Sequence, residues 1–176
     1  YVVPEWYNEH IPDLSKKNKN SDILNEVSTN FNYLIISTLT SIHADHDRKN
    51  LLNTLCWLFE KHKDDTDVGI ILKTSLGRGS KKDKIETSAY LRKLVSTFRE
   101  GAFPKLHLVH GNMDSSEVAD LYYDKKVKCM VSATRGEGYG LPLVDAAAAG
   151  MPIITTNWSG HLEFLKDYQF LPIDYD

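Results

Sequence analysis

Two carboxylates, Glu137 and Asp145, stand eight residues apart in a stretch that is otherwise mostly glycine, alanine and apolar residues. A carboxylate accepts hydrogen bonds on both of its oxygens, so it suits the neighbouring hydroxyls of a sugar or a ribose. Glu137 falls in a glycine-rich turn and Asp145 in the first turns of the helix predicted after it, so both can face one pocket. For Asp145 alone, a favourable charge near a helix N-terminus is the ordinary alternative, but it leaves Glu137 without a role.

The turn that carries Glu137 has three glycines within residues 136–140, which let the backbone bend sharply with no side chain to block a ligand. It follows an apolar run at 127–133, and Pro142 and Gly150 suit the first turn and the end of a helix. The pattern predicts a helix N-terminus whose free amides favour an anion such as phosphate. It is not the dinucleotide fingerprint, because those glycines should follow the first strand of the domain and these follow the fourth.

The elements that must position these acids alternate along the chain. Short apolar, β-branched runs are typical of strands buried on both faces, and apolar residues at three- and four-residue spacing predict helices between them. Asp114 followed by Glu117 fits an N-cap with a capping box. We expect strands at 33–38, 68–73, 106–110, 127–133 and 152–156, and helices at 48–62, 85–98, 114–123, 141–149 and 159–166.

This alternation implies right-handed crossovers and a parallel sheet covered on both faces. The expected fold class is therefore α/β, a Rossmann-like three-layer sandwich whose ligands bind at the carboxyl ends of the strands. Residues 1–31 contain prolines, a polar run at 15–22 and one weak helical pattern at 23–27, and we assign them to a linker segment that leads into a domain at 32–176. Residues 77–82 are expected to form an exposed loop.

Length, charge and cysteine content limit the classes of function. The 176 residues suit one domain of ordinary size, and the net charge of -3 argues against a nucleic-acid binder. The apolar runs are far shorter than the roughly 20 residues that a membrane span needs, and no signal peptide is visible, so we expect a cytoplasmic protein. Cys56 and Cys129 predict buried thiols rather than a disulfide or zinc site. The start at Tyr1 suggests a fragment of a longer protein.

The stretch from Glu137 to Thr156 resembles the signature of the retaining, nucleotide-sugar glycosyltransferases of the GT-B fold, group 1 or family 4-like. The family pattern is Glu, seven residues, Glu, in the context Glu-Gly-Phe-Gly-Leu-Pro, with Glu-Ala and Gly-x-Pro-Val after it. This chain reads Glu-Gly-Tyr-Gly-Leu-Pro-Leu-Val-Asp-Ala and then Gly-Met-Pro-Ile. The second acid, Asp145, is one methylene shorter than the family's. The resemblance implies one half of a GT-B fold, the C-terminal domain that binds the donor, without the upstream domain that binds the acceptor.

The resemblance also implies roles for individual residues. Glu137 would contact the donor sugar and Asp145 the ribose hydroxyls. A loop after the third strand would meet the nucleotide base, although an ordinary turn is the alternative there. The loop residues implied to bind the donor are Gly138, Tyr139, Gly140 and Leu141, together with Gly111, Asn112 and Met113.

Two cations, Arg48 and Lys49, resemble the family's Arg-Lys-Gly element, whose lysine binds the donor diphosphate. Such chemistry needs cations, because breaking the sugar–phosphate bond leaves charge on the departing nucleotide diphosphate. A basic pair left in solvent is the alternative. The family's Gly-Arg after the first strand is replaced here by Ser-Thr-Leu at 37–39, and either Arg48 or Lys73, at the end of the second strand, is a candidate for the arginine's place.

The implied function is a glycosyltransferase domain that binds a nucleotide-diphosphate sugar and, with the absent domain, transfers the sugar with retention of configuration to a glycan or other acceptor. The isolated domain would transfer little or none. Catalysis would rest on positioning and on stabilising the diphosphate, with no cofactor and no metal, since the neighbouring His43, Asp45, His46 and Asp47 of one loop rarely converge on one ion. A GT-B epimerase and a non-catalytic nucleotide-binding or interaction module remain as alternatives.

Overall fold

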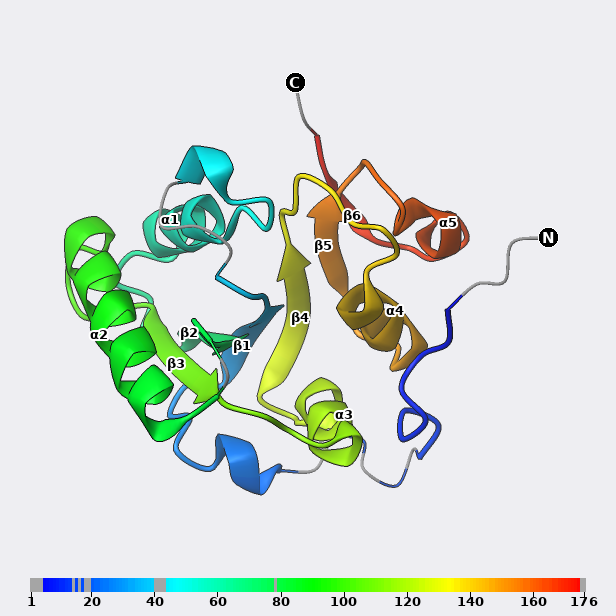
Figure 1. Cartoon of the computed structure of the whole chain (residues 1–176), viewed down its shortest axis with the longest axis horizontal. Helices are drawn as coiled ribbons and strands as arrows, with labels where there is room; N and C mark the ends of the chain where they lie inside the picture. Colours follow the sequence, from blue (N-terminus) through cyan, green and yellow to red (C-terminus); the bar gives the residue numbers. More distant parts are fainter. Residues whose placement is uncertain are drawn as a thin grey trace.

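Six parallel strands form one sheet in the order β3-β2-β1-β4-β5-β6 (Figure 1). The computed structural model describes residues 5–13, 15, 17, 20–39, 44–77 and 79–174; Tyr1 and His43, singled out in the sequence, lie outside the described residues. This order is doubly wound, with the winding reversed between β1 and β4, and it confirms the predicted α/β fold. The strands are β1 (Phe31–Ile36), β2 (Val68–Thr74), β3 (Lys105–His110), β4 (Val127–Ser132), β5 (Ile153–Thr156) and β6 (Leu171–Ile173).

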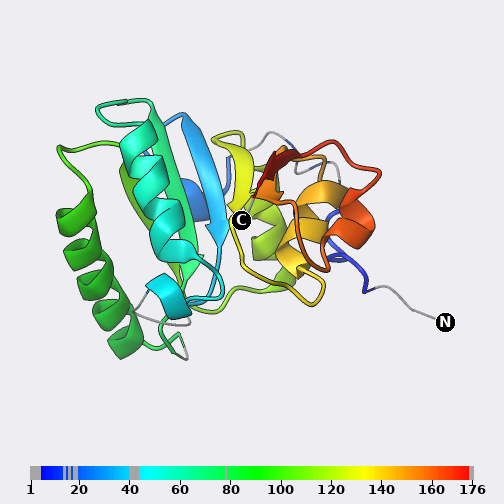
Figure 2. The ribbon, with the colours of Figure 1, turned by 90° about the horizontal axis from the view of Figure 1, so that it is seen from above.

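Helices cover both faces of the sheet, α1 and α2 on one side and α3 and α4 on the other (Figure 2). None of the described helices is long and apolar enough to cross a membrane. The helices are α1 (Leu51–Lys61), α2 (Lys81–Phe98), α3 (Ser115–Tyr123), α4 (Leu141–Ala148) and α5 (Leu162–Leu165), with 3₁₀ turns at Asp22–Leu24 and Ala44–His46.

Neighbouring side chains of the central strands enter two different cores. Leu34 of β1 and Met130 of β4 face α3 and α4, whereas Ile35 of β1 and Leu72 of β2 face α1 and α2. Because both faces are covered, these strands are apolar at consecutive positions, which is why the sequence pattern predicts them so clearly.

Several predicted boundaries are wrong at helix starts. Helix α2 begins at Lys81 rather than at residue 85, because the Ser80 hydroxyl accepts a hydrogen bond from the Asp83 N–H at 3.1 Å and caps the helix. Part of the predicted loop at 77–82 is therefore helical. Helix α1 begins at Leu51 and not at residue 48, and the helical pattern at 23–27 forms only a 3₁₀ turn.

The capping box of α3 is confirmed, since Asp114 and Glu117 each accept a hydrogen bond from the other's backbone N–H. Strand β6 was not predicted. It has three residues, its Leu171 is 63% exposed and it pairs only with β5 among the described strands. Its three residues, Leu-Pro-Ile, are too few for a strand pattern, and a central proline argues against a strand.

The described part of the predicted linker packs into the core on the α3 side. Ile11 and Leu24 are only 2% and 1% exposed, and the Tyr123 hydroxyl donates a hydrogen bond to the Ile11 carbonyl. The Asp124 carboxylate accepts from the Ser21 N–H. These contacts attach Ile11 and Ser21 to the end of α3, while the division of the chain at residue 31 stays a prediction.

Candidate functional site

The loops that leave β1 and β4 meet at the carboxyl ends of these paired strands (Figure 1). The winding of the sheet reverses here, so the two loops diverge and leave a crevice, which is where doubly wound folds bind their ligands. Arg48 and Lys49 come from the loop before α1, and Glu137 comes from the loop between β4 and α4. The fold thus brings Glu137 together with Arg48 and Lys49, which precede it by 89 and 88 positions.

Glu137 is bound by both predicted cations. The Lys49 Nζ donates to Glu137 Oε1, and the Arg48 Nη1 lies 3.3 Å from Glu137 Oε2. Arg48 also donates to the Gly136 carbonyl. The Glu137 and Lys49 side chains are 11% and 16% exposed, against 52% for Arg48. Lys49 is therefore a partly buried, paired cation rather than one left in solvent.

The surroundings of Glu137 keep it ionised. Burial alone would raise the pKa of this carboxyl, but the hydrogen bond and charge of Lys49, with Arg48 beside it, bring the pKa below its ordinary value. The three side chains then carry one net positive charge. A diphosphate that reached this cluster would meet cations already held in place.

Hydroxyl groups fix the backbone on both sides of the cluster. The Ser159 hydroxyl donates to the Glu137 carbonyl at 2.8 Å and accepts from the Glu137 N–H at 2.9 Å. The Thr134 hydroxyl donates to the carbonyl of Arg48 at 3.2 Å. Neither residue was predicted, because a small hydroxyl side chain in a turn has many structural uses.

Asp47, considered above only as a poor metal ligand, is a structural cap. It is fully buried, and its carboxylate accepts from the Leu51 N–H at 2.7 Å and the Lys49 N–H at 3.1 Å. It therefore starts α1 and orients the backbone of Lys49. Within the residues that the structure describes, no group of three or more His, Cys, Asp or Glu side chains is arranged to hold a metal ion.

Close approach explains one glycine beside the site. The Gly160 N–H donates to the Glu137 carbonyl at 3.2 Å, and a Cβ on Gly160 would lie 2.0 Å from the Gly138 carbonyl oxygen. Gly140 has a φ of 92° and precedes α4, so it needs the left-handed conformation that glycine adopts freely. The shape of the loop at 136–140 thus depends on glycines outside as well as inside it.

Asp145 is placed apart from this cluster. It lies on α4, is 9% exposed, and its Oδ1 accepts a hydrogen bond from the Asn8 N–H at 2.7 Å. In the described part of the chain it shares no hydrogen-bond or ion-pair partner with Glu137. Burial raises the pKa of Asp145, and the Asn8 N–H offsets this only in part.

The raised pKa of Asp145 makes a prediction about stability. A carboxyl whose pKa is higher in the folded than in the unfolded chain favours folding at low pH, and this contribution is lost as pH rises through the folded pKa. Asp145→Asn cannot ionise and keeps an oxygen for the Asn8 N–H. We expect the variant to exceed the wild type in free energy of unfolding at neutral pH and to match it at acid pH, measured by urea titrations. An equal difference at both pH values would contradict this.

Lys73 does not join the cluster. Its Nζ donates to the Gly111 carbonyl at 2.8 Å, so it holds the loop between β3 and α3. Of the two candidates for the family's first arginine, Arg48 contacts Glu137 and Lys73 does not. In the same loop Met113 packs against the core, and Asn112 lies against the turn at Gly79.

The remaining predicted donor residues lie on the loop before α4 and at its start. The Tyr139 ring centroid is 5.1 Å from that of Phe164, a Cβ on Gly138 would meet open space, and Leu141 is 49% exposed. Gly138 and Leu141 are therefore accessible to a ligand, whereas Gly140 is buried.

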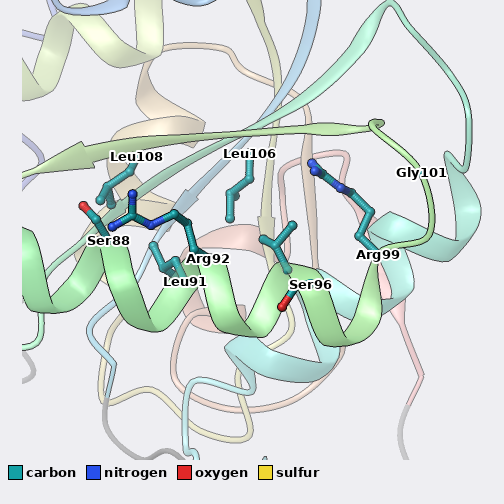
Figure 3. A pocket seen from close by; sticks show the side chains of 9 residues that line it. Ser88, Leu91, Arg92, Ser96, Arg99, Gly101, Leu106 and Leu108 are labelled. Atoms are coloured by element: carbon teal, nitrogen blue, oxygen red, sulfur yellow. The ribbon is translucent and has the colours of Figure 1, made fainter.

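Two hollows lie at the candidate site, and a third lies away from it. A crevice of about 10 Å³ between β1 and β4 is lined by Lys49, and one of about 460 Å³ lies beside it, bordered by Arg135 and the exposed Trp57 and Trp158. A groove of about 520 Å³ lies between α2 and β3, with Arg92 and Arg99 along it (Figure 3). The groove lies at β3, two strands from β1, where the winding reverses. It touches none of the predicted site residues.

Comparison with known proteins identifies the family of this chain. Residues 77–173, more than half of the chain, match the sequence model of the family described as glycosyl transferases group 1. The chain belongs to this family. The matched range contains the loop with Glu137 and helix α4 with Asp145, while Arg48 and Lys49 precede it. No curated protein matches the sequence of this group 1 glycosyltransferase domain.

Solved structures with the same fold are GT-B glycosyltransferases. An E. coli trehalose-phosphate enzyme bound with UDP-2-fluoro glucose has a TM-score of 0.52 at 9% identity, covering 92% of this chain and 34% of that one. Sucrose-phosphate synthase from Thermosynechococcus elongatus has 0.60 at 19%, covering 92% and 37%. A trehalose-6-phosphate synthase described in a study of glycosyltransfer with retention has 0.57 at 11%, covering 97% and 39%. The group 1 domain thus spans well under half of each relative, and the predicted GT-B resemblance is confirmed.

Proposed function

We propose that this group 1 glycosyltransferase domain binds a nucleotide-diphosphate sugar as donor, and that the full enzyme transfers the sugar with retention of configuration to a glycan or other acceptor held by a second domain. The observation that carries the proposal is the convergence of Arg48, Lys49 and Glu137 where the winding reverses. Two similar proteins support its finer points: one was solved with a UDP-sugar analogue, and one is described as transferring with retention.

In this proposal each charged residue has a separate task. Lys49 and Arg48 bind the diphosphate and neutralise the charge that grows on it as the sugar–phosphate bond breaks. Glu137, ionised and fixed through its backbone by Ser159, accepts hydrogen bonds from sugar hydroxyls. Asp145 receives the ribose hydroxyls, and the amides of residues 138–141 meet the sugar and diphosphate. Neither a metal ion nor a cofactor takes part.

The internal ion pair has a consequence for binding. In the structure Lys49 pairs with Glu137. A bound diphosphate must therefore either share the Lys49 ammonium with Glu137 or replace Glu137 as its partner. The donor supplies both partners at once, because its phosphates compensate Lys49 and its sugar hydroxyls compensate Glu137. Free sugar supplies only the second, and we therefore expect it to bind far more weakly than a nucleoside diphosphate.

Calorimetric titration tests donor binding. The chain is titrated with UDP, GDP, ADP and the corresponding nucleotide-sugars, and Glu137→Ala and Asp145→Ala are expected to weaken binding of the preferred nucleotide-sugar at least tenfold, about 1.4 kcal/mol each. Glu100→Ala is the matched control, since Glu100 is 78% exposed and pairs only with Lys63 in the described structure. Binding unchanged in both site variants would refute the donor site.

Transfer needs its own test, because the family also allows an epimerase or a binding module. The full-length protein is incubated with the nucleotide-sugar that binds, and the anomeric configuration of any product is read by NMR. A product whose sugar keeps the donor's configuration supports the proposal. An epimerised nucleotide-sugar, or no turnover with any acceptor, would contradict it.

A further inference from the structure

The N-terminal segment covers the carboxylate proposed to hold the ribose. Glu5–Asn8 runs beside α4 (Figure 1), and the Asn8 N–H donates to Asp145 Oδ1 at 2.7 Å. The Asn8 side-chain amide donates to the Ser115 carbonyl at 2.6 Å, at the start of α3. Asn8 thus bridges α4, which carries Asp145, and the start of α3.

Beyond Asn8 the segment is anchored. Ile11 is 2% exposed, and its carbonyl accepts the Tyr123 hydroxyl. Its N–H donates to the Asn8 carbonyl at 3.0 Å, which forms a turn between them. Before Asn8, Trp6 is 73% exposed and stacks at 4.6 Å on Tyr7, which is only partly buried against the core. The contact with Asp145 can therefore open if Tyr7 leaves this packing, while the anchor at Ile11 stays.

We propose that residues 5–8 form a strap that occupies the ribose-binding carboxylate when no donor is bound and that the ribose diol displaces. This inference rests on the proposed function. The strap supplies the same chemistry as a ribose hydroxyl, a hydrogen-bond donor aimed at Asp145 Oδ1. A diol needs both oxygens of the carboxylate to bind in its two-pronged geometry, and the Asn8 N–H already occupies one acceptor position of Oδ1.

The strap lowers the apparent affinity for donor by the fraction of molecules in which it is docked. It thereby makes binding depend on the ribose hydroxyls, since a nucleotide without them gains nothing from displacing Asn8. Asn8 is in this sense a specificity-determining residue that acts through Asp145 and is not itself catalytic.

Two substitutions release the strap by different means. Asn8→Pro removes the N–H that binds Asp145, and Asn8→Ala keeps that N–H but removes the side-chain bond to Ser115. Titration with UDP, GDP and ADP, and with their 2′,3′-dideoxy counterparts, measures the effect. We expect both variants to bind the preferred ribonucleotide about threefold to tenfold more tightly than wild type, with unchanged affinity for the dideoxynucleotide. Glu9→Ala, next in the chain and exposed, is the control and should match wild type.

Hydrogen exchange gives a second readout in the wild-type chain. The Asn8 amide should be protected without ligand and lose protection when the ribonucleotide is bound, but not when the dideoxynucleotide is bound. Variants that bind the ribonucleotide no better than wild type, or that change both nucleotides in parallel, would overturn the strap and leave the donor site standing. Absence of nucleotide binding by wild type and both variants would overturn the donor site and the strap together.

Discussion

Lys49→Met is expected to weaken nucleoside diphosphate binding about 30-fold, close to 2 kcal/mol. Lys49 is partly buried and pairs with Glu137, so its ammonium is held where the diphosphate arrives rather than drawn in from solvent. A pre-oriented cation in a site of lowered dielectric stabilises an anion far more than an exposed one does. Without Lys49 the pKa of Glu137 should also rise, since the hydrogen bond and charge that lower it are lost.

Calorimetry with the preferred nucleoside diphosphate measures this effect. Lys82→Met is the matched control. Lys82 is 85% exposed and lies on α2, outside the cluster of Arg48, Lys49 and Glu137. Arg48→Met should have a smaller effect than Lys49→Met, as Arg48 is about half exposed and more strongly screened. A dissociation constant for Lys49→Met within twofold of wild type would exclude this lysine from the diphosphate site.

Gly160→Ala is expected to destabilise the chain by about 1–3 kcal/mol and to impair donor binding at the same time. The new methyl group would stand 2.0 Å from the Gly138 carbonyl oxygen and 2.8 Å from the Glu137 carbonyl oxygen. Both neighbours are backbone atoms, which cannot swing aside as a flexible side chain does. The loop at 136–140 must therefore shift, and the Glu137 carboxylate moves with it.

Gly138→Ala is the matched control for the loss of stability expected of Gly160→Ala. A Cβ on Gly138 meets nothing within 4 Å, so this variant should unfold at the same urea concentration as wild type. Gly160→Ala should unfold at a lower concentration. Equal midpoints for the two variants would show that the loop adapts to the methyl group without strain.

The fold was predictable because the central strands are buried on both faces. Leu34 and Ile35, for example, point to opposite cores and are both apolar. A strand buried on both faces therefore appears in the sequence as a run of consecutive apolar residues. The sequence does not show which strands pair across the sheet, and β6 escaped detection because it has only three residues with Pro172 among them. The start of α2 was missed for a similar reason, since its cap depends on Ser80 and its first turn is charged.

The charged part of the site was predictable from residue type, and its supports were not. Glu137 stands out because it lies among glycines, and Lys49 because it belongs to a basic pair just before a helix, where cations are unfavourable. Ser159 acts through backbone contacts that any small polar residue in a turn could make. Asn8 could not be foreseen, because the group that contacts Asp145 is its backbone N–H, which every residue except proline carries.

The reversal of winding between β1 and β4 also bears on how the chain folds. These strands are neighbours in the sheet, yet β2 and β3 lie between them in sequence, so the pair closes a long loop at considerable entropic cost. A chain in which only β1, β2 and β3 had paired would hold Arg48 and Lys49 with no acid opposite them. The cluster is completed only when both halves of the sheet have joined. A ligand bound there stabilises the finished fold alone, and its binding therefore depends on the pairing of β1 with β4.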